Sequence, residues 1–422
     1  MNSNINNEDT ALSDKSKYSE KFISDILEKC GQDKLFTYYN NLNPNEKIIL
    51  ARQIEDIDWS FLEPHKSYAS DKNISPINIM SVDNIKEKKD EYSKIGIKSI
   101  QEGKLALVLL AGGQGTRLGY DHPKGMFDVG ISKSLYIFEA LINNTMKVVE
   151  QAGCFIPFYI MTSSINNDET IAFFKEHDYF GYNPEYITFF VQESNPVTDF
   201  EGNVLLSDRT SLCISPNGNG GWFSSMDKNG LLHTILDSPV EWINVFSVDN
   251  VLQGIADPVF LGATIDSGLT CGAKVVAKAA PDEKVGAICS MNGRPHIIEY
   301  YELSQEMMNE KNPDGTYAYG YGVILNYLFP VKKLTRTLNS EMPLHIVKKA
   351  VPYMDYDGNF ISSDEVNAFK YETLALDLIH AMDTCLAYEI ERDKEFAPIK
   401  NKSGIDSIDT ARELLIKNGV EL

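Results

Sequence analysis

The chain has 422 residues, enough for two or three domains around one large core, and 43% of them are hydrophobic, as is ordinary for a globular protein. Its formal net charge of −21 argues against binding to nucleic acid or to an anionic membrane, because both need basic surfaces. No apolar run approaches the ~20 residues that cross a bilayer, and the 6 cysteines include no C-x-x-C pair, so we expect reduced thiols in the cytoplasm.

The N-terminal part of the sequence carries no pattern that indicates chemistry. Residues 1–16 are polar and rich in Asn, Asp and Ser, which predicts a disordered tail. Apolar residues recur at helical spacing within residues 17–102, and the charged run Lys86–Lys94 is typical of a solvated helix face. We therefore expect a helical N-terminal region that packs on a catalytic domain.

Strands and helices alternate from residue 103 to residue 385, which predicts an α/β catalytic domain with a mostly parallel sheet. The expected strands are Leu105–Leu110, Phe155–Thr162, Ile187–Gln192, Ile243–Val248 and Gly286–Ser290, and the expected helices are Ser134–Gln151, Asn167–His177 and Asp257–Ser267. Residues 386–422 form a short C-terminal region. In open α/β sheets ligands bind at the carboxyl ends of strands, so residues that follow strands are the functional candidates.

The apolar strand Leu105–Leu110 is followed at once by a glycine-rich loop. Glycine lets the backbone approach a ligand, and successive free N–H groups bind phosphate oxygens. Arg117 and Lys124 add positive charge, so we predict that Ala111–Lys124 holds a nucleoside triphosphate. The loop is not a P-loop, because no Gly-Lys-Ser/Thr closes it, and its third glycine comes one residue late for a dinucleotide fingerprint. The alternative is a plain turn that binds no ligand, although a plain turn does not require the two cationic side chains.

Residues 110–119, Leu-Ala-Gly-Gly-Gln-Gly-Thr-Arg-Leu-Gly, followed by Pro-Lys-Gly-Met at 123–126, resemble the signature of the UDP-N-acetylhexosamine pyrophosphorylases. That group belongs to the wider UDP-sugar pyrophosphorylase family, which includes the UTP–glucose-1-phosphate uridylyltransferases. The resemblance implies a Rossmann-like nucleotidyltransferase sheet of the nucleotide-diphospho-sugar transferase type. It also implies UTP and a sugar 1-phosphate as substrates and Mg²⁺ as cofactor, with Mn²⁺ as a substitute. We expect a monomer or a weak homo-oligomer.

The resemblance assigns roles to residues that mostly follow strands. The amide of Gln192 can donate and accept together, which suits the edge of a uracil ring. Asp249 ends an apolar strand and resembles a metal-binding aspartate, in keeping with the preference of Mg²⁺ for carboxylate and phosphate oxygens. The full implied set is Leu110, Ala111, Gly112, Gly113, Gly115, Thr116, Lys124, Gln192, Gly218 and Lys370 for the nucleotide, Asn219, Gly286, Glu299 and Tyr300 for the sugar, Asp249 for the metal, and Arg117, Lys124 and Lys400 for catalysis.

Several of these positions also have ordinary structural interpretations. Gln192 could be a surface residue at a strand end, and Asp249 could cap the next segment. Lys370, in a stretch that we expect to be helix-rich, and Lys400 could simply be solvated. The sequence also departs from the family at the sugar side: Val323 stands where an Asn usually contacts the sugar. The other departures are Asn217, where the family usually has Asp, and Leu374 and Leu376, where it often has Phe beside the N-acyl group.

The chemistry that follows from the resemblance is an in-line attack of a sugar 1-phosphate oxygen on the α-phosphorus of UTP. Two unit charges 4 Å apart repel by ~4 kcal/mol at an effective dielectric of ~20, which explains why cations gather at such a site. We expect N-acetylglucosamine 1-phosphate as the substrate; N-acetylgalactosamine 1-phosphate, glucose 1-phosphate and a broader hexose range stay open. An NAD-dependent oxidoreductase and a nucleotide-binding regulator with a decayed site are the competing classes.

Overall fold

The computed structural model of the protein describes residues 20–62, 73–338 and 342–422, so the predicted tail at residues 1–16 lies outside the described residues. The chain forms two compact units. Unit 1 comprises the described parts of Met1–Ser67, Glu193–Gly218 and Pro343–Thr373, and unit 2 comprises those of Tyr68–Gln192, Asn219–Met342 and Leu374–Leu422. Each unit is built from segments far apart in sequence, which differs from the contiguous domains at 17–102, 103–385 and 386–422 that the sequence predicts.

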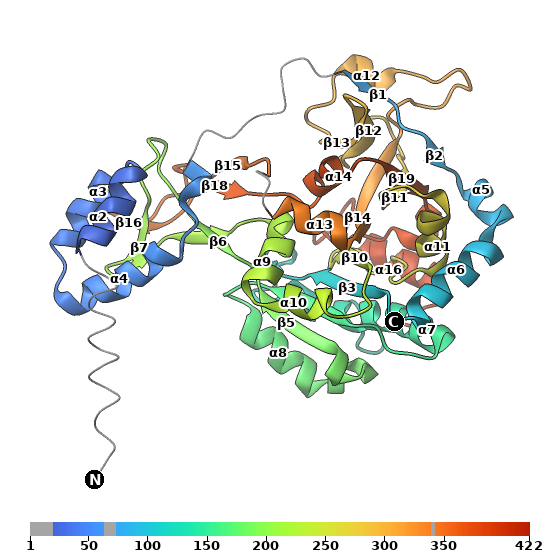
Figure 1. The fold of residues 1–422 in the computed structure, drawn as a ribbon, viewed down its shortest axis with the longest axis horizontal. Helices are drawn as coiled ribbons and strands as arrows, with labels where there is room; N and C mark the ends of the chain where they lie inside the picture. Colours follow the sequence, from blue (N-terminus) through green and yellow to red (C-terminus); the bar gives the residue numbers. More distant parts are fainter. Residues whose placement is uncertain (1–19, 63–72, 339–341) are drawn as a thin grey trace, which may run out of the picture. The chain divides into compact units, whose positions relative to one another are not determined.

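The core of unit 2 is a large β-sheet whose main path runs β2–β19–β11–β14–β10–β3–β4–β5 (Figure 1). Neighbours on this path are parallel, except that β14 runs antiparallel to β11 and β10. The prediction of a mostly parallel α/β sheet is therefore confirmed. The strands are β2 (Ile79–Met80), β3 (Leu105–Leu110), β4 (Phe158–Thr162), β5 (Ile187–Val191), β10 (Trp242–Ser247), β11 (Cys271–Ala277), β14 (Tyr321–Pro330) and β19 (Cys385–Glu389). The short strand β1 (Ile74–Ser75) and the hairpin of β12 (Ala287–Met291) and β13 (Arg294–Ile298) join beside β14.

Strand β3 shows why this sheet is covered on both faces. All of its residues are buried: its odd-numbered residues belong to one apolar cluster and its even-numbered residues to another. Side chains alternate across a strand, so an uninterrupted apolar run needs helices on both sides. One layer contains α6 (Lys89–Gln101), α7 (Ile137–Ala152), α8 (Asn167–Glu176), α11 (Pro258–Ser267) and α16 (Ile408–Lys417), and the other contains α9 (Trp222–Lys228), α10 (Leu231–Leu236), α13 (Val331–Thr337) and α14 (Asp377–Ala381).

Helices α6 and α11 pack backbone to backbone through glycines. A Cβ on Gly96 would lie 1.9 Å from the carbonyl oxygen of Pro258, and a Cβ on Gly262 would lie 1.9 Å from that of Tyr92. This contact binds α6, and α5 (Val82–Glu87) before it in the chain, to unit 2. The N-terminal helical region predicted at 17–102 is thus divided between the two units.

Unit 1 holds the other N-terminal helices, α2 (Glu20–Lys29), α3 (Asp33–Asn40) and α4 (Pro44–Asp56). Their buried side chains pack on Val204, Leu206 and Leu212, which explains why the segment 193–218 joins these helices. The strands of this unit are β6 (Ser194–Pro196), β7 (Leu206–Asp208), β8 (Ser211–Leu212), β9 (Ile214–Pro216), β15 (His345–Lys349), β16 (Tyr353–Met354), β17 (Phe360–Ile361) and β18 (Ala368–Glu372). Lys370 lies in β18, paired with β15, so the expectation of a helix-rich surrounding for it is wrong.

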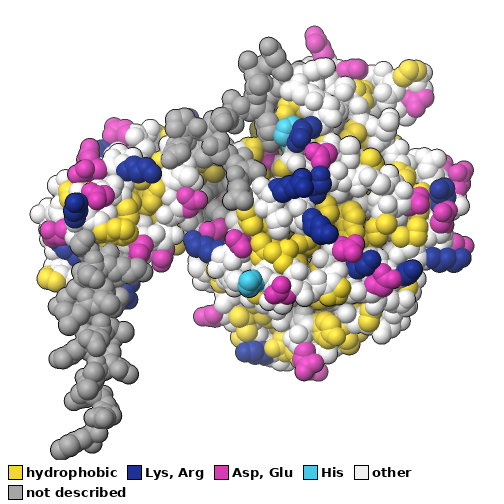
Figure 2. Space-filling model, viewed as in Figure 1, with side chains coloured by type: hydrophobic (Ala, Val, Ile, Leu, Met, Phe, Trp, Pro, Cys, Tyr) yellow, Lys and Arg dark blue, Asp and Glu magenta, His cyan; other side chains and the backbone are white. Residues whose placement is uncertain are grey.

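Acidic and basic side chains are interspersed on the face of unit 2 that Figure 2 presents, with apolar side chains between them. Of the helices within residues 20–62, 73–338 and 342–422, none has the length and apolar character needed to cross a membrane. The 6 cysteines are all free thiols.

Candidate active site

Parallel strands β10, β3, β4 and β5 end at one edge of the sheet. The register pairs Ser247 with Leu110, Leu110 with Met161, and Thr162 with Val191. The residues that follow these strands therefore gather at this edge, as the strand-end rule requires. They are the segment that begins at residue 248, the glycine-rich loop at 111–124, and residue 192.

The glycine-rich loop presents free amides at this edge. Two hydrogen bonds close the loop, from Gly115 N to His122 O (2.9 Å) and from Lys124 N to Gly113 O (3.2 Å). Within the described part of the chain, the amides of residues 112–114 donate to no protein acceptor. Neighbouring N–H groups of this kind form a concave anion site, so the geometry fits the predicted phosphate loop.

A glycine next to Lys124 determines where this lysine lies. Lys124 begins the short 3-10 helix η3 (Lys124–Met126), and a Cβ on Gly125 would lie 2.2 Å from the ring of Phe138 in α7. Only glycine lets this segment lie directly on the buried helix. The side chain of Lys124 is consequently 11% exposed, in contact with the core rather than extended into solvent.

The ammonium of Lys124 meets the carboxylate of Asp249. Lys124 Nζ lies 2.5 Å from Asp249 Oδ1, although the two residues are 125 positions apart in sequence. The Asp249 side chain is 37% exposed, and its Oδ2 forms no hydrogen bond within the described residues. A cation predicted to bind phosphate and a carboxylate predicted to bind metal thus face the same space.

Gln192 lies next to the glycine-rich loop. Its side chain is buried, and a Cβ on Gly112 would lie 2.8 Å from Gln192 Oε1. The side-chain amide forms no hydrogen bond with any residue that the structure describes. Its donor and acceptor atoms are therefore available to a ligand with complementary groups. The interpretation of Gln192 as a surface residue does not agree with this burial.

A pocket of about 240 Å³ in unit 2 adjoins Asp249. Its lining includes five residues of the predicted set, namely Asn219, Asp249, Gly286, Glu299 and Lys400. Asn219, in the 3-10 helix η6 (Asn219–Gly221), is oriented because its Oδ1 accepts a hydrogen bond from Ala375 N (2.9 Å). Three of the four positions that depart from the family pattern, Val323, Leu374 and Leu376, supply an apolar part of the same lining.

Lys400 reaches this pocket on a C-terminal segment that lies along the residues after β10. Ile399 N donates to Asp249 O (2.9 Å), and residues 250 and 398 form an isolated β-bridge. The ammonium of Lys400 is 3.0 Å from Asp406 Oδ2. The hydrogen bond from Ile399, next to Lys400, thereby places this lysine beside Asp249, which is distant from it in sequence.

Other predicted residues lie elsewhere. Thr116 and Arg117 are exposed in the 3-10 helix η2 (Thr116–Leu118), and Tyr300 stacks edge-on against Tyr301 outside the pocket lining. Gly218 and Lys370 belong to unit 1. Gly218 has a φ of +88°, and a Cβ there would lie 2.3 Å from the carbonyl oxygen of Thr373, so only glycine fits. The ligand roles assigned to these residues stay predictions.

Sequence inspection missed some residues of the pocket. Lys284, Leu325 and Tyr327 line it, and none was predicted. Leu325 has a φ of +53°, within an irregularity of β14 that lies between Val323 and Tyr327. The apolar run Tyr321–Pro330 could have indicated a strand, but nothing in it indicates the irregularity. The exposed Lys284 has no sequence signal of its own.

Comparisons with known proteins bear on this arrangement. A model of the family described as UTP–glucose-1-phosphate uridylyltransferase matches residues 47–416. The chain belongs to this family of nucleotidyltransferases. It is 34% identical to the UDP-N-acetylglucosamine pyrophosphorylase of Saccharomyces cerevisiae, over 93% of this chain and 88% of that protein. It is also 34% identical to the mouse UDP-N-acetylhexosamine pyrophosphorylase-like protein 1, over 92% of this chain and 82% of that protein.

A solved structure of the family has the same fold. The uridine diphosphate N-acetylglucosamine pyrophosphorylase of Trypanosoma brucei, crystallised with an inhibitor, superposes with a TM-score of 0.80 and 26% identity, over 94% of this chain and 84% of that one. The resemblance drawn from the residues at 110–126 is therefore confirmed at the level of the family. Membership in this family excludes the NAD-dependent oxidoreductase.

Proposed function

We propose that this protein forms UDP-N-acetylglucosamine and pyrophosphate from UTP and N-acetylglucosamine 1-phosphate. The observation that carries the proposal is the contact of Lys124 with Asp249 at the end of β10, beside a pocket that also contains Lys400. The names of the relatives in yeast and mouse support the N-acetylated sugar.

The chemistry needs no general base, because the attacking phosphate oxygen is already an anion at neutral pH. The work of the protein is to hold two polyanions in line and to stabilise the charge of the leaving pyrophosphate. The free amides at residues 112–114, with Arg117 and Lys124, suit the pyrophosphate side of UTP, and Gln192 suits the uracil edge. Lys400 suits the phosphate of the sugar, with Asn219 and Glu299 near its hydroxyl groups. Lys370 and Gly218 are proposed as further nucleotide contacts.

A magnesium ion is part of the proposal, and the residues present fit it. Asp249 offers one carboxylate with an oxygen that is free of protein partners within the described residues. Mg²⁺ commonly takes one or two carboxylates and completes its shell with phosphate oxygens and water. Among the described residues, no group of three or more His, Cys, Asp or Glu side chains could hold a metal ion by itself. When bound, the ion would neutralise phosphate charge.

A second candidate is a UTP–glucose-1-phosphate uridylyltransferase or an enzyme of broader hexose range. Val323 favours it, because Val lacks the side-chain amide with which the family's Asn contacts the sugar. Leu374 and Leu376 favour it as well, because side chains smaller than Phe would reshape the pocket beside the N-acyl group.

The deciding experiment measures pyrophosphate release from UTP with a panel of sugar 1-phosphates: N-acetylglucosamine, N-acetylgalactosamine and glucose. We expect the highest kcat/KM with N-acetylglucosamine 1-phosphate. The variant Asp249→Asn is the control that separates the proposed site from a contaminating activity. No UDP-sugar formed from the N-acetylated substrates, with turnover of glucose 1-phosphate, would reject the first candidate in favour of the second. No pyrophosphate released with any sugar would favour a regulator with a decayed site.

A further inference from the structure

Lys274, in β11, is a buried cation that the proposed chemistry does not use. Its side chain has no exposed surface. Lys274 Nζ donates to Asp257 Oδ2 (2.8 Å), to Glu395 Oε2 (2.5 Å) and to Gly254 O (3.2 Å), so each of its three N–H groups has an acceptor. Burial alone would lower the pKa of Lys274, but the charges of Asp257 and Glu395 outweigh burial and raise it. The side chain therefore stays charged at neutral pH.

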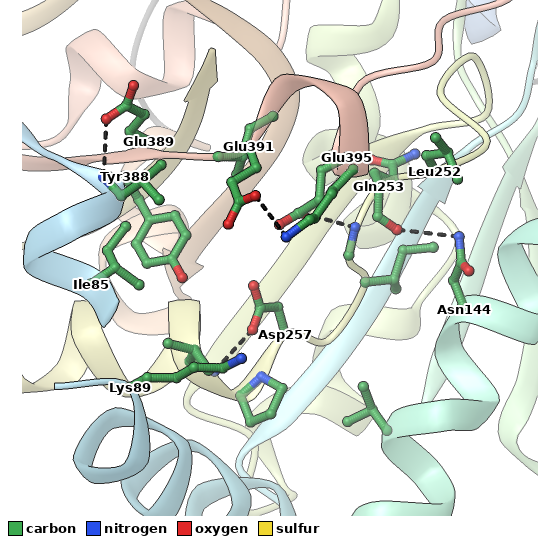
Figure 3. Close-up of a pocket in the computed structure, with 18 of the residues that line it drawn as sticks. Ile85, Lys89, Asn144, Leu252, Gln253, Asp257, Tyr388, Glu389, Glu391 and Glu395 are labelled. Carbon is green, nitrogen blue, oxygen red and sulfur yellow. Dashed lines mark hydrogen bonds and ion pairs between the residues drawn. The ribbon is translucent and has the colours of Figure 1, made fainter. Parts of the chain in front are cut away.

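The two carboxylates that hold Lys274 also hold the backbone. Both line a pocket of about 420 Å³, where Figure 3 shows them among residues from several segments of unit 2. Asp257 Oδ1 accepts from Val259 N (2.9 Å) at the start of α11, and Glu395 Oε2 accepts from Gly254 N (3.0 Å). A Cβ on Gly254 would lie 2.8 Å from Glu395 Oε2 and 2.9 Å from Lys274 Nζ, so a side chain there would displace these two groups. The start of α11, the turn at residue 254 and the end of α15 (Arg392–Glu395) are thus tied to one ammonium.

Glu395 connects this cluster to the candidate active site. Asn250 Nδ2 donates to Glu395 O (2.7 Å), and Asn250 Oδ1 accepts from Ala397 N (2.9 Å). The chain then continues as the segment 396–400, which is held to Asp249 by the hydrogen bond from Ile399 N. Three side chains of this segment, Phe396, Pro398 and Lys400, line the 240 Å³ pocket.

A second path runs from the same cluster to the pocket wall. Gly254 O accepts a hydrogen bond from Asn326 Nδ2 (3.1 Å) as well as from Lys274. Asn326 Nδ2 also donates to Gln253 Oε1 (3.2 Å), and Gln253 in turn donates to Asn250 O (2.8 Å). Asn326 is next in sequence to Leu325, the pocket residue with positive φ. Every side chain of this network is buried or part-buried, which favours one fixed arrangement.

We infer that Lys274 is a positioning residue for the proposed uridylyl transfer: through Glu395 and Asn250 it holds the segment 396–400 against Asp249, so that Lys400 and Asp249 face one pocket. The inference rests on the proposed function, because it names what sets the geometry of that site. Lys274 acts through other residues and has no contact with substrate. The alternative is an ion pair that stabilises the fold without affecting the placement of Lys400.

A double-mutant cycle with Lys400 separates these two roles. The single variants are Lys274→Met, which keeps the length of the side chain without its charge, and Lys400→Ala. Pyrophosphate release is measured for both, for the double variant and for the wild type. Displacing a reacting group by about 1 Å costs about 10²-fold in rate, so we expect Lys274→Met to lower kcat/KM by that order. We expect the double variant to lie within about threefold of Lys400→Ala alone, because Lys400 is the residue through which Lys274 acts.

A matched control accounts for lost stability. Phe174, fully buried in α8, lies outside the machinery described above, and Phe174→Leu also destabilises the core. We expect it to lower the urea midpoint with kcat unchanged. If Lys274→Met does not fold, Glu395→Gln enters the same cycle, since it keeps an acceptor for Gly254 N and removes one of the two charges that hold Lys274.

The outcomes are distinct. Multiplicative losses in the double variant, or a Lys274→Met enzyme with wild-type kcat/KM, would overturn the positioning role. Full activity of Lys400→Ala would overturn it as well, since Lys400 would then have no role to position. These results all require an active wild type. A wild type that releases no pyrophosphate from any sugar 1-phosphate would reject the proposed function itself.

Discussion

Removing the ammonium of Lys124 is the most direct test of the site. Lys124→Met keeps most of the buried alkyl stem and deletes only the charged end. Lys124 Nζ lies 2.5 Å from Asp249 Oδ1 in the protein, which shows that it can approach an anion at hydrogen-bond distance. Unit charges ~3 Å apart at an effective dielectric of ~20 interact by ~5 kcal/mol, which is an upper bound. Loss of one preorganised donor to a developing negative charge typically costs ~3–4 kcal/mol, or about 10²- to 10³-fold in kcat.

The effect of this substitution on stability is expected to be small. The partner carboxylate is 37% exposed, so solvent screens the ion pair and its loss costs about 1 kcal/mol or less of the free energy of unfolding. The assay is pyrophosphate release at saturating UTP and sugar 1-phosphate, with urea unfolding of the same preparation. Lys133→Met is the control, because Lys133 is exposed and pairs only with Glu421 among the described residues. A Lys124→Met enzyme with kcat within threefold of the wild type would refute the reasoning.

Three further predictions follow from particular contacts. Asp249→Asn should raise the Mg²⁺ concentration for half-maximal pyrophosphate release by about tenfold or more, because a neutral amide is a weaker ligand for a hard cation than a carboxylate is. An unchanged Mg²⁺ concentration at half-maximal release would contradict the metal role of Asp249. Gly125→Ala puts a Cβ 2.2 Å from the Phe138 ring, so it should lower the free energy of unfolding in urea by about 1–3 kcal/mol. A Cβ on Gly113 would meet nothing within 4 Å, so Gly113→Ala should leave stability unchanged and raise the KM for UTP. Burial raises the pKa of Cys289 from 9.0 to about 12, so between these pH values the folded chain keeps a thiol proton that the unfolded chain has lost. The contribution of this thiol to the free energy of unfolding is therefore complete below pH 9 and is lost as the pH rises from 9 to 12. Wild type should therefore lose about 1.4 kcal/mol more than Cys289→Ala between pH 8 and pH 10, and equal losses would contradict the assignment.

Local patterns predicted the fold class and several strands closely. The strand Leu105–Leu110 agrees at both ends with β3, because an apolar run between turn residues marks a buried strand. Helix α11 starts at Pro258, next to the capping Asp257, one residue inside the predicted boundary. Strands β11, β14 and β19 were missed. The segments 193–218 and 343–373 were predicted to belong to the catalytic domain at 103–385, whereas the structure groups them with the N-terminal helices in unit 1. The residues that these segments pack against are distant in sequence, so no local sequence pattern can predict the contacts.

The sequence by itself singled out the glycine-rich loop as the candidate phosphate site, because glycine spacing and nearby cations are properties of contiguous residues that need no partner. It also indicated that Gln192 and Asp249 follow strands. Both residues were therefore expected at the edge of the parallel sheet where the carboxyl ends of the strands lie. Only the tertiary structure decided that Lys124 meets Asp249, that the segment carrying Lys400 lies along the residues after β10, and that Lys274 ties this segment in place. The physical reason is that each of these contacts joins residues more than a hundred positions apart, and the folding of the whole sheet brings them together.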